Sequence, residues 1–232
     1  MKTLTVMVPF YNEARTLPEL VRQLSEIDRQ IIDGCIFVDD GSNDDSYQVL
    51  RQSLIDFPFN NKIIRQSNMG KAKAIEAATK ELTTSHAVVL DADLELDTSE
   101  IARLWAIVTT SHFDIVFGYR EFLAQSSFTY RYARGNRIIS HLYGLLFNEV
   151  ITDVMCGFKL LPSELWQKCE FKFSKFAMEI EIPLLMWKHH LRPFEIRVNY
   201  FPRTREQGKI IGIRDAIQII VLLLYYRLSN RR

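Results

Sequence analysis

The stretch that decides the fold is His86-Ala-Val-Val-Leu-Asp-Ala-Asp-Leu-Glu95, a short apolar run that passes directly into acidic residues. An apolar run of this length is typical of a strand that is buried on both faces of a parallel sheet. Ligands of open α/β sheets bind beyond the carboxyl ends of the strands. The stretch therefore predicts an α/β fold whose ligand site includes the acids at the end of this strand.

On both sides of this strand, apolar runs alternate with amphipathic stretches. The predicted strands are 4–8, 35–38, 62–65, 86–90 and 113–118, and the predicted helices are 17–27, 46–57, 71–82 and one that starts at 97. Thr16-x-x-Glu19 at the first helix has the capping-box pattern. This order predicts a mostly parallel sheet flanked by helices, followed after 118 by a more helical half.

The composition narrows the class of protein. The 232 residues are 47% hydrophobic, which suffices for one sizeable core. Lys and Arg total 29 against 28 Asp and Glu, so the overall charge gives no reason to expect a nucleic-acid partner. Cys35, Cys156 and Cys169 are odd in number and lack CxxC spacing, which disfavours a disulfide framework or zinc site and favours a reducing cytosol.

Asp91 and Asp93 are the first candidate metal ligands. They lie two positions apart, so in an extended segment both side chains point the same way and can approach one divalent ion. Carboxylate oxygens suit Mg²⁺ or Mn²⁺, which bridge proteins to phosphates. Glu95 continues the same period as a third ligand or as the holder of a metal-bound water. The alternative is that these acids only cap the following helix.

Two other strand ends carry unusual polar residues. The first strand ends in Pro9-Phe-Tyr-Asn-Glu13, and the second in Asp39-Asp-Gly-Ser-Asn-Asp44. All three strand ends can converge on one crevice. A turn with Gly41 at the bend and an N-cap would explain the second strand end alone, but capping explains the two acid-rich ends together less well.

These residues resemble those of glycosyltransferase family 2, and within it the dolichyl- and polyprenyl-phosphate sugar synthases. The similar motifs span residues 4 to about 209: Val8-Pro-Phe-Tyr-Asn-Glu13, Val38-Asp-Asp-Gly-Ser-Asn-Asp44, Asn68-Met-Gly-Lys71, Asp91-Ala-Asp93, Gly118-Tyr-Arg120, Thr152-Asp153 with Cys156-Gly-Phe-Lys159, and Arg203 to Lys209. The chain departs from the family pattern at Glu95, where many relatives have Gln, at Ala72, and at Gln207-Gly208-Lys209. These departures affect the loops and leave the class unchanged.

The resemblance implies a GT-A (Rossmann-like) fold that binds a nucleotide-sugar. It assigns Pro9, Tyr11, Glu13 and Asp40 to the nucleoside pocket, with Asp40 reading the base, and it places Gly70, Lys71, Asp91, Ala92 and Asp93 along the nucleotide-sugar and its metal. Gly70-Lys71 also appears in P-loops, but Gln66 stands where a P-loop has its upstream glycine. A P-loop is therefore excluded.

The second half supplies cations for an anionic acceptor. The resemblance places Arg120, Arg203 and Lys209 near phosphates and aligns Asn136 with a serine of relatives. Arg131, Arg134 and Arg137 recur at every third position and would share one helix face, although a solvated face explains this trio equally well. Asp153 is expected either to orient arginines or to act as a base toward a hydroxyl acceptor. With Asp93, the residues Arg120, Asp153, Arg203 and Lys209 form the predicted catalytic set.

Apolar residues follow the arginines in 138–147 and recur in the C-terminal segment 213–228. Such helices suit a lipid phosphate at a membrane interface, although core packing would account for many of these residues. The run 216–226 is shorter than the ~20 residues of a spanning helix. We therefore expect a catalytic domain at 1–210 and an amphipathic C-terminal helix at 211–232, peripheral at the cytoplasmic membrane face.

The leading hypothesis is a metal-dependent transfer of a sugar, with inversion, from a nucleotide-diphosphate sugar to a polyprenyl phosphate. The first alternative keeps this donor and uses a saccharide or other hydroxyl acceptor. A third reading is a non-catalytic scaffold that binds nucleotide. A homo-oligomer or a membrane-protein partner is compatible with each of these readings.

Overall fold

The computed structural model describes residues 2–121, 130–169, 171, 177–203 and 213–229, without the side chains of 130–132, 177 and 213–216. The described strands are β1 (Leu4–Phe10), β2 (Gly34–Asp39), β3 (Asn60–Arg65), β4 (His86–Val89), β5 (Val116–Arg120), β6 (Lys159–Pro162) and β7 (Phe194–Val198). The described helices are α1 (Leu17–Ser25), α2 (Ser46–Ser53), α3 (Lys71–Thr79), α4 (Glu100–Thr110), α5 (Tyr130–Phe147), α6 (Ser163–Gln167), α7 (Ala177–Lys188) and α8 (Ile213–Ser229).

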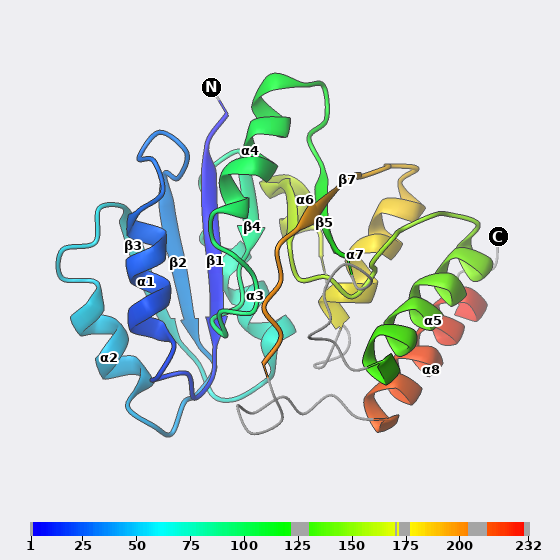
Figure 1. Cartoon of the computed structure of the whole chain (residues 1–232), viewed down its shortest axis with the longest axis horizontal. Helices are drawn as coiled ribbons and strands as arrows, with labels where there is room; N and C mark the ends of the chain where they lie inside the picture. The colour runs from blue at the N-terminus through cyan, green and yellow to red at the C-terminus, as the bar shows by residue number, and fades with distance from the viewer. Residues whose placement is uncertain (1, 122–129, 170, 172–176, 204–212, 230–232) are drawn as a thin grey trace.

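The strands form one seven-stranded sheet in the order β3-β2-β1-β4-β6-β5-β7 (Figure 1). β3, β2, β1 and β4 are parallel neighbours, so their carboxyl ends lie at one edge of the sheet. β6 runs antiparallel between β4 and β5, and β7 is parallel to β5. The predicted mostly parallel α/β sheet is confirmed, and β6 and β7 are additions that the alternating pattern did not indicate.

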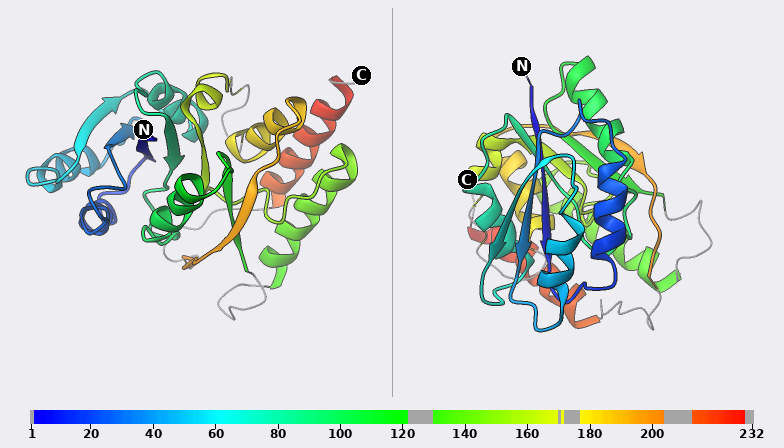
Figure 2. Two further views of the ribbon diagram at one scale, coloured as in Figure 1. Left: turned by 90° about the horizontal axis from the view of Figure 1, so that it is seen from above. Right: turned by 90° about the vertical axis from the view of Figure 1, so that its left-hand side faces the viewer.

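Helices cover both faces of the sheet (Figure 2). One core joins Val6 and Val8 of β1 to α1, α2 and α4. The other core joins Met7 of the same strand to α3, α5, α6, α7 and α8. Successive residues of β1 thus face opposite cores, which explains why the strand is a continuous apolar run.

α5 and α8 pack side by side at one end of the sheet (Figures 1 and 2). Tyr143 of α5 and Leu223 and Tyr226 of α8 face inward and are buried. The Tyr226 hydroxyl donates a hydrogen bond to Glu181 of α7. In the part of the chain that the structure describes, no helix is both long and apolar enough to cross a bilayer.

The start of α1 differs from the predicted capping box. Thr16 has a helical backbone, and its hydroxyl donates to the Glu13 carboxylate at 2.8 Å instead of capping the helix. Glu19 pairs with Arg22, one turn further along α1. Thr16 therefore holds Glu13 at the end of β1, which connects this helix start to the predicted site.

Gly41, in the loop after β2, is the glycine for which we predict the largest effect of an added methyl group. Its φ is +76°, and a Cβ there would lie 2.6 Å from the backbone nitrogen of Asn68. Gly41→Ala is expected to lower the free energy of unfolding by about 2–3 kcal/mol, measured by urea unfolding, because the loop must adopt a strained backbone and shift.

Gly135→Ala is the matched control for this substitution. Gly135 lies within α5, and a Cβ there meets nothing within 4 Å. Because alanine favours a helix interior over glycine, this variant is expected to gain up to about 1 kcal/mol. Equal losses in the two variants would contradict the strain assigned to Gly41.

Candidate active site

The ends of β1, β2 and β4, which the sequence predicts to meet at one crevice, are joined by backbone and side-chain hydrogen bonds. The backbone nitrogen of Asp40 donates to the carbonyl of Phe10 at 2.9 Å, and that of Leu90 donates to Met7 at 2.9 Å. Asn12, with a φ of 55°, donates its backbone N–H to Ser42 at 3.0 Å. The three strand ends that the sequence predicts to form one site therefore lie next to one another.

Asp40 is buried and organises the segment that leads into α3. Its carboxylate accepts hydrogen bonds from the backbone nitrogens of Met69 at 2.9 Å and Gly70 at 2.8 Å, and from the Gln66 amide at 2.7 Å. Gly70 has a φ of +92°. Asp40 thereby positions Gly70 and the following Lys71, while base reading by Asp40 stays a prediction. Tyr11, which directly follows β1, is 42% exposed.

Lys71 bridges two acids from different elements. Its ammonium lies 2.7 Å from Asp91, at the end of β4, and 3.0 Å from Glu179 of α7. Burial opposes the charge on Lys71, but these acids outweigh burial and hold the pKa of Lys71 above its usual range. Burial likewise raises the pKa of Glu179, but Lys71 and Lys159 hold it below its usual range. Both shifts favour the ionised forms of Lys71 and Glu179.

Asp93 faces the same crevice and carries a perturbed carboxyl. Burial, and then the nearby charges of Asp91 and Glu95, raise the pKa of Asp93 to about 6. Arg203 opposes this shift, with one guanidinium nitrogen 3.0 Å from Asp93 and another 3.2 Å from Glu13. Arg203 therefore connects the segment after β7 to the ends of β1 and β4.

Glu95, the predicted third metal ligand, is engaged by residues other than Asp91 and Asp93. It accepts a hydrogen bond from the Tyr200 hydroxyl and another from the backbone nitrogen of Arg203 at 2.8 Å. Among the described residues, no group of three acids, histidines or cysteines is arranged to hold a metal ion. Asp91, Asp93 and Glu95 therefore do not form a ready three-carboxylate cluster, and a direct ligand role for Glu95 stays a prediction.

The residues of the crevice nevertheless fit a divalent cation. The carboxylates of Glu13, Asp91, Asp93, Glu95 and Glu179 outnumber the cations paired with them, Lys71 and Arg203. Burial is the largest cause of the raised pKa of Asp93, and the nearby charges of Asp91 and Glu95 add to it. Hard oxygen donors in such a field suit Mg²⁺ or Mn²⁺, with Asp91 and Asp93 as the residues that would hold the ion.

A second, cationic part of the site is built around Arg120 at the end of β5. Its guanidinium donates to both carboxylate oxygens of Asp153, at 2.7 and 3.0 Å, and lies 5.0 Å from the ring centroid of Tyr200. The Asn136 amide donates to Asp153 at 2.6 Å. Burial would raise the pKa of Asp153, but Arg120 and Asn136 outweigh burial and hold it below its usual range.

The predicted arginine series of α5 is placed only in part. Asn136 is buried in the Arg120–Asp153 network, whereas Arg134 and Arg137 lie exposed on the same helix. The side chain of Arg131 and all of Lys209 lie outside the described residues. The roles of Arg131 at the acceptor phosphate and of Lys209 in catalysis therefore stay predictions.

Tyr200 belongs to the site but was not among the predicted site residues. Its ring packs on the Arg120 guanidinium and its hydroxyl contacts Glu95, so it joins the two parts of the crevice. Phe194, Ile196, Val198 and Tyr200 alternate with polar residues at the period of a strand. That alternation was the available signal both for β7 and for Tyr200.

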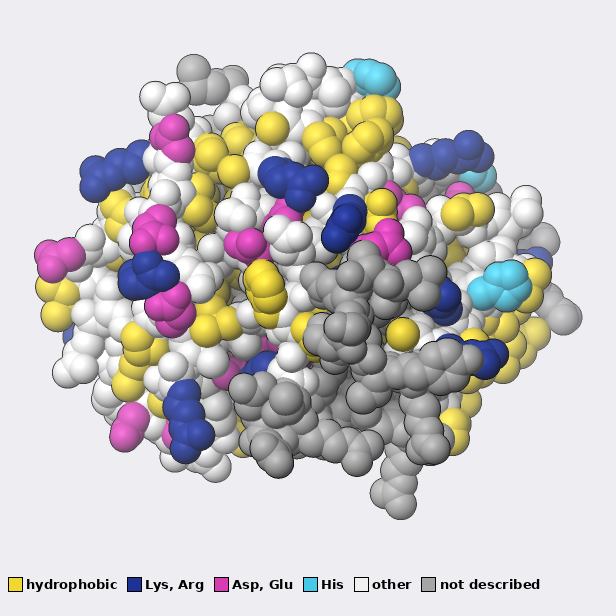
Figure 3. All heavy atoms as spheres, viewed as in Figure 1, with side chains coloured by type: hydrophobic (Ala, Val, Ile, Leu, Met, Phe, Trp, Pro, Cys, Tyr) yellow, Lys and Arg dark blue, Asp and Glu magenta, His cyan; other side chains and the backbone are white. Residues whose placement is uncertain are grey.

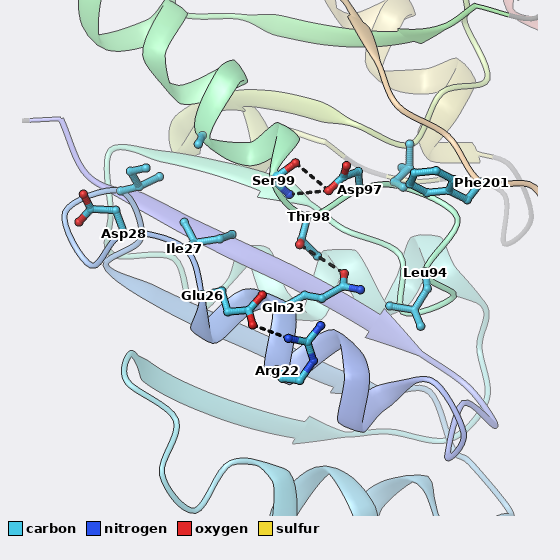
Figure 4. Close-up of a pocket in the computed structure, with 13 residues that line it drawn as sticks. Arg22, Gln23, Glu26, Ile27, Asp28, Leu94, Asp97, Thr98, Ser99 and Phe201 are labelled. Carbon is cyan, nitrogen blue, oxygen red and sulfur yellow. Dashed lines mark hydrogen bonds and ion pairs between the residues drawn. The ribbon is translucent and has the colours of Figure 1, made fainter. Parts of the chain in front are cut away.

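A separate cavity of about 600 Å³ lies between α1, the start of α4 and Phe201 (Figure 4). Several of the charged and polar residues that Figure 4 labels pair with one another, as in Arg22 with Glu26 and Thr98 with Gln23. None of its lining residues belongs to the predicted donor or acceptor sets. We therefore locate the site at the acidic strand ends.

Three comparisons with known proteins agree with this geometry. Residues 5–169 match the family model described as glycosyl transferase family 2. The glucosyl-3-phosphoglycerate synthase of Mycobacterium tuberculosis, solved with Mn²⁺, UDP and phosphoglyceric acid, superposes with a TM-score of 0.76 at 16% identity, covering 100% of this chain and 80% of that one. At this identity the likeness shows the fold alone. The fold class is thus GT-A, and the chain belongs to glycosyl transferase family 2.

Two similar sequences carry names that concern lipid phosphates. An undecaprenyl-phosphate 4-deoxy-4-formamido-L-arabinose transferase of Pseudomonas fluorescens is 36% identical over 116 residues, which are 48% of this chain and 34% of that protein. A dolichyl-phosphate beta-glucosyltransferase of Trichomonas vaginalis is 24% identical, covering 97% of this chain and 74% of that protein. The chain thus spans about a third of the length of the Pseudomonas relative.

Proposed function

We propose that this chain is an inverting, metal-dependent glycosyltransferase that moves a sugar from a nucleotide-diphosphate sugar to a polyprenyl phosphate at the cytoplasmic face of a membrane. The observation that carries the proposal is the buried Arg120, which Asp153 and Asn136 hold beside the acidic crevice. A fixed arginine next to a metal-binding carboxylate pair suits an anionic acceptor beside a diphosphate donor. The names of the two relatives support the same acceptor class.

On the donor side, the strand ends supply the contacts for the nucleotide. We assign Tyr11 and the segment held by Asp40 to the nucleoside, and Lys71, which contacts Asp91, to the diphosphate. When bound at Asp91 and Asp93, Mg²⁺ or Mn²⁺ offsets the charge that develops on the departing diphosphate. Arg203, paired with Asp93, adds a cation on the same side.

On the acceptor side, the state of Asp153 distinguishes a phosphate from a hydroxyl. A hydroxyl acceptor needs a general base, whereas a phosphate is already anionic and needs cations. Both oxygens of Asp153 are engaged by Arg120 and Asn136, and its pKa lies below its usual range. Asp153 therefore suits the orientation of Arg120 better than proton abstraction, which favours the phosphate acceptor.

The reaction is a single displacement. An oxygen of the lipid phosphate attacks the anomeric carbon as the bond from that carbon to the nucleoside diphosphate breaks, which inverts the anomeric configuration. The products are the polyprenyl-phosphate sugar and the nucleoside diphosphate. Because substrate positioning contributes much of the rate of such a step, Arg120 and Lys71 must hold the two anions on opposite sides of the sugar.

The test incubates the purified chain with Mn²⁺ or Mg²⁺, a panel of nucleotide sugars and a short polyprenyl phosphate, and measures release of nucleoside diphosphate. Release that requires the lipid phosphate and one donor is the expected result. Release that requires a saccharide instead would support the hydroxyl-acceptor alternative. Binding of metal and nucleotide without any release of nucleoside diphosphate would support the hypothesis of a non-catalytic nucleotide-binding scaffold.

The outer faces of α5 and α8 form a surface that suits an anionic bilayer, here called the apolar platform. It consists of Ile138, Leu145, Ile217, Val221, Leu224 and Leu228, each between 42 and 71% exposed. Figure 3 shows hydrophobic side chains gathered at the right-hand edge, where α5 lies in Figure 1. Arg134, Arg137 and Arg227 lie on the same helices, and segments 133–147 and 217–229 contain no acid. We assign the C-terminal segment 211–232, of which the structure describes α8, to the membrane surface beside the catalytic domain 1–210.

Liposome flotation tests this surface. Wild type is expected to float with vesicles of phosphatidylcholine and phosphatidylserine, and Val221→Glu with Leu224→Glu to bind at least about tenfold more weakly, because apolar contact and charge attraction are both reduced. Ile55→Glu is the matched control, since Ile55 is 78% exposed and lies just after α2, at the far end of the sheet. Equal loss in the control, or a dimer that the double variant dissociates, would contradict membrane docking.

A further inference from the structure

The turn 153–157 lies between the donor and acceptor parts of the site. At its start, Asp153 holds Arg120. At its end, Gly157 passes so close to the donor side that a Cβ there would lie 2.9 Å from a carboxylate oxygen of Asp91. The start of this turn therefore contacts the acceptor part through Arg120, and its end borders the donor part at Asp91.

Lys159 holds this turn from the inside. It begins β6, is 1% exposed, and its ammonium donates to the carbonyl of Val154 at 3.0 Å and to that of Cys156. The ammonium also lies 5.2 Å from the ring centroid of Phe117, its partner in the β5–β6 register. The two carbonyls belong to the peptides that link Asp153 to Gly157, so Lys159 fixes the turn at its middle.

A buried lysine at this place carries the free-energy cost of removing its charge from water. Burial lowers the pKa of Lys159, although the nearby Cys156, Glu179 and Asp153 oppose the shift. An apolar side chain of similar length fills such a site without the desolvation of a charge, and replacing buried ionic groups by apolar ones is often neutral or stabilising. Packing alone therefore does not explain a lysine, whereas two oriented carbonyls beside Asp153 do.

We propose that Lys159 is a positioning residue, which fixes the turn 153–157 so that Asp153 directs Arg120 at the acceptor phosphate. This inference rests on the proposed function and extends it to a residue that contacts neither substrate. Ser140 of α5 supports the same turn, because its hydroxyl accepts a hydrogen bond from the backbone nitrogen of Val154 at 3.1 Å.

Lys159→Met removes the ammonium and keeps most of the volume. We expect kcat/KM for the polyprenyl phosphate to fall about 10- to 100-fold, since misplacement of about 1 Å has effects of this size. Calorimetric affinity for Mn²⁺ with nucleoside diphosphate should change less than about twofold, because Asp91 keeps its contacts. Calorimetric binding of the short polyprenyl phosphate gives the acceptor affinity without turnover.

Two further variants separate positioning from stability. Tyr143→Phe removes a buried hydrogen bond to the Pro183 carbonyl, 3.0 Å long, and leaves the turn untouched, so it controls for a general loss of stability. Ser140→Ala loosens the turn without removing a charge, and is expected to weaken acceptor use in the same direction but less. It tests the proposal even where Lys159→Met does not fold.

Gly157→Ala is the reciprocal variant for the donor side. The added methyl group would push against Asp91, so binding of Mn²⁺ with nucleoside diphosphate is expected to weaken about tenfold, while polyprenyl-phosphate affinity changes little. Equal losses for donor and acceptor in Lys159→Met and Ser140→Ala, or losses no larger than in Tyr143→Phe, would overturn the positioning role. A wild type that neither binds nor glycosylates the lipid phosphate would overturn the proposed function itself.

Discussion

Replacement of Asp93 by asparagine is expected to lower kcat about 10³-fold, which corresponds to about 4 kcal/mol of transition-state stabilisation. The amide removes one of the two carboxylates that would hold the divalent ion, and it removes the charge that Arg203 contacts at 3.0 Å. The shape of the side chain is nearly unchanged, so the loss of activity should come from the missing charge near the diphosphate. Release of nucleoside diphosphate in the lipid-phosphate assay measures the effect, and titration with Mn²⁺ followed by electron paramagnetic resonance measures the lost metal affinity.

Asp97→Asn provides the matched control. Asp97 stands in the same loop but bonds to Ser99 at the start of α4. Its replacement is expected to lower stability by about 1 kcal/mol and to leave Mn²⁺ affinity unchanged. Asp93→Asn with wild-type Mn²⁺ affinity and near wild-type turnover would contradict the assignment of the metal to Asp91 and Asp93.

The first half of the fold could be predicted because its strands are apolar runs with helices between them. His86–Leu90 and Leu4–Val8 carry no competing pattern, so their place in a parallel sheet followed from length and burial. β6 and β7 lacked this clarity. Lys159 begins β6 as a buried charge, and β7 is half-exposed, so neither presents the continuous apolar run of a buried strand.

The candidate site could be predicted as a set of residues, but their partners could not. Asp40 was expected near the base, and Asp153 at the acceptor with the orientation of arginines as one alternative, but the structure adds the particular partners, the segment 66–70 for Asp40 and Arg120 for Asp153. These pairings join segments far apart in the chain and depend on register and loop geometry. Spacing along the sequence carries no information on such pairings; the alternation of 194–200 indicates a strand that includes Tyr200, but not its contacts with Arg120 and Glu95.

Arg120→Lys is expected to lower kcat/KM for the lipid phosphate about 10²- to 10³-fold, or about 3–4 kcal/mol, with donor affinity nearly unchanged. Lysine keeps the positive charge, but it cannot make both contacts to Asp153, at 2.7 and 3.0 Å. It also lacks the planar guanidinium that stacks on the ring of Tyr200. Steady-state kinetics with varied polyprenyl phosphate measure the loss. Arg103→Lys is the matched control, since Arg103 is exposed and pairs with the buried Glu100 of α4, and it should keep full activity.

Asp153→Asn, alone and combined with Arg120→Lys, shows what the carboxylate does. If Asp153 acts through Arg120, the double variant should lose little more than the worse single variant, with a coupling of about 1–3 kcal/mol. If Asp153 is instead a general base, Asp153→Asn should abolish transfer with Arg120 intact, and Arg120→Lys should retain substantial activity. The buried bidentate pair, with Asn136 as a further donor to Asp153, favours the first result. An arginine held in this way needs its carboxylate ionised throughout, which a base that gains a proton in each turnover does not provide.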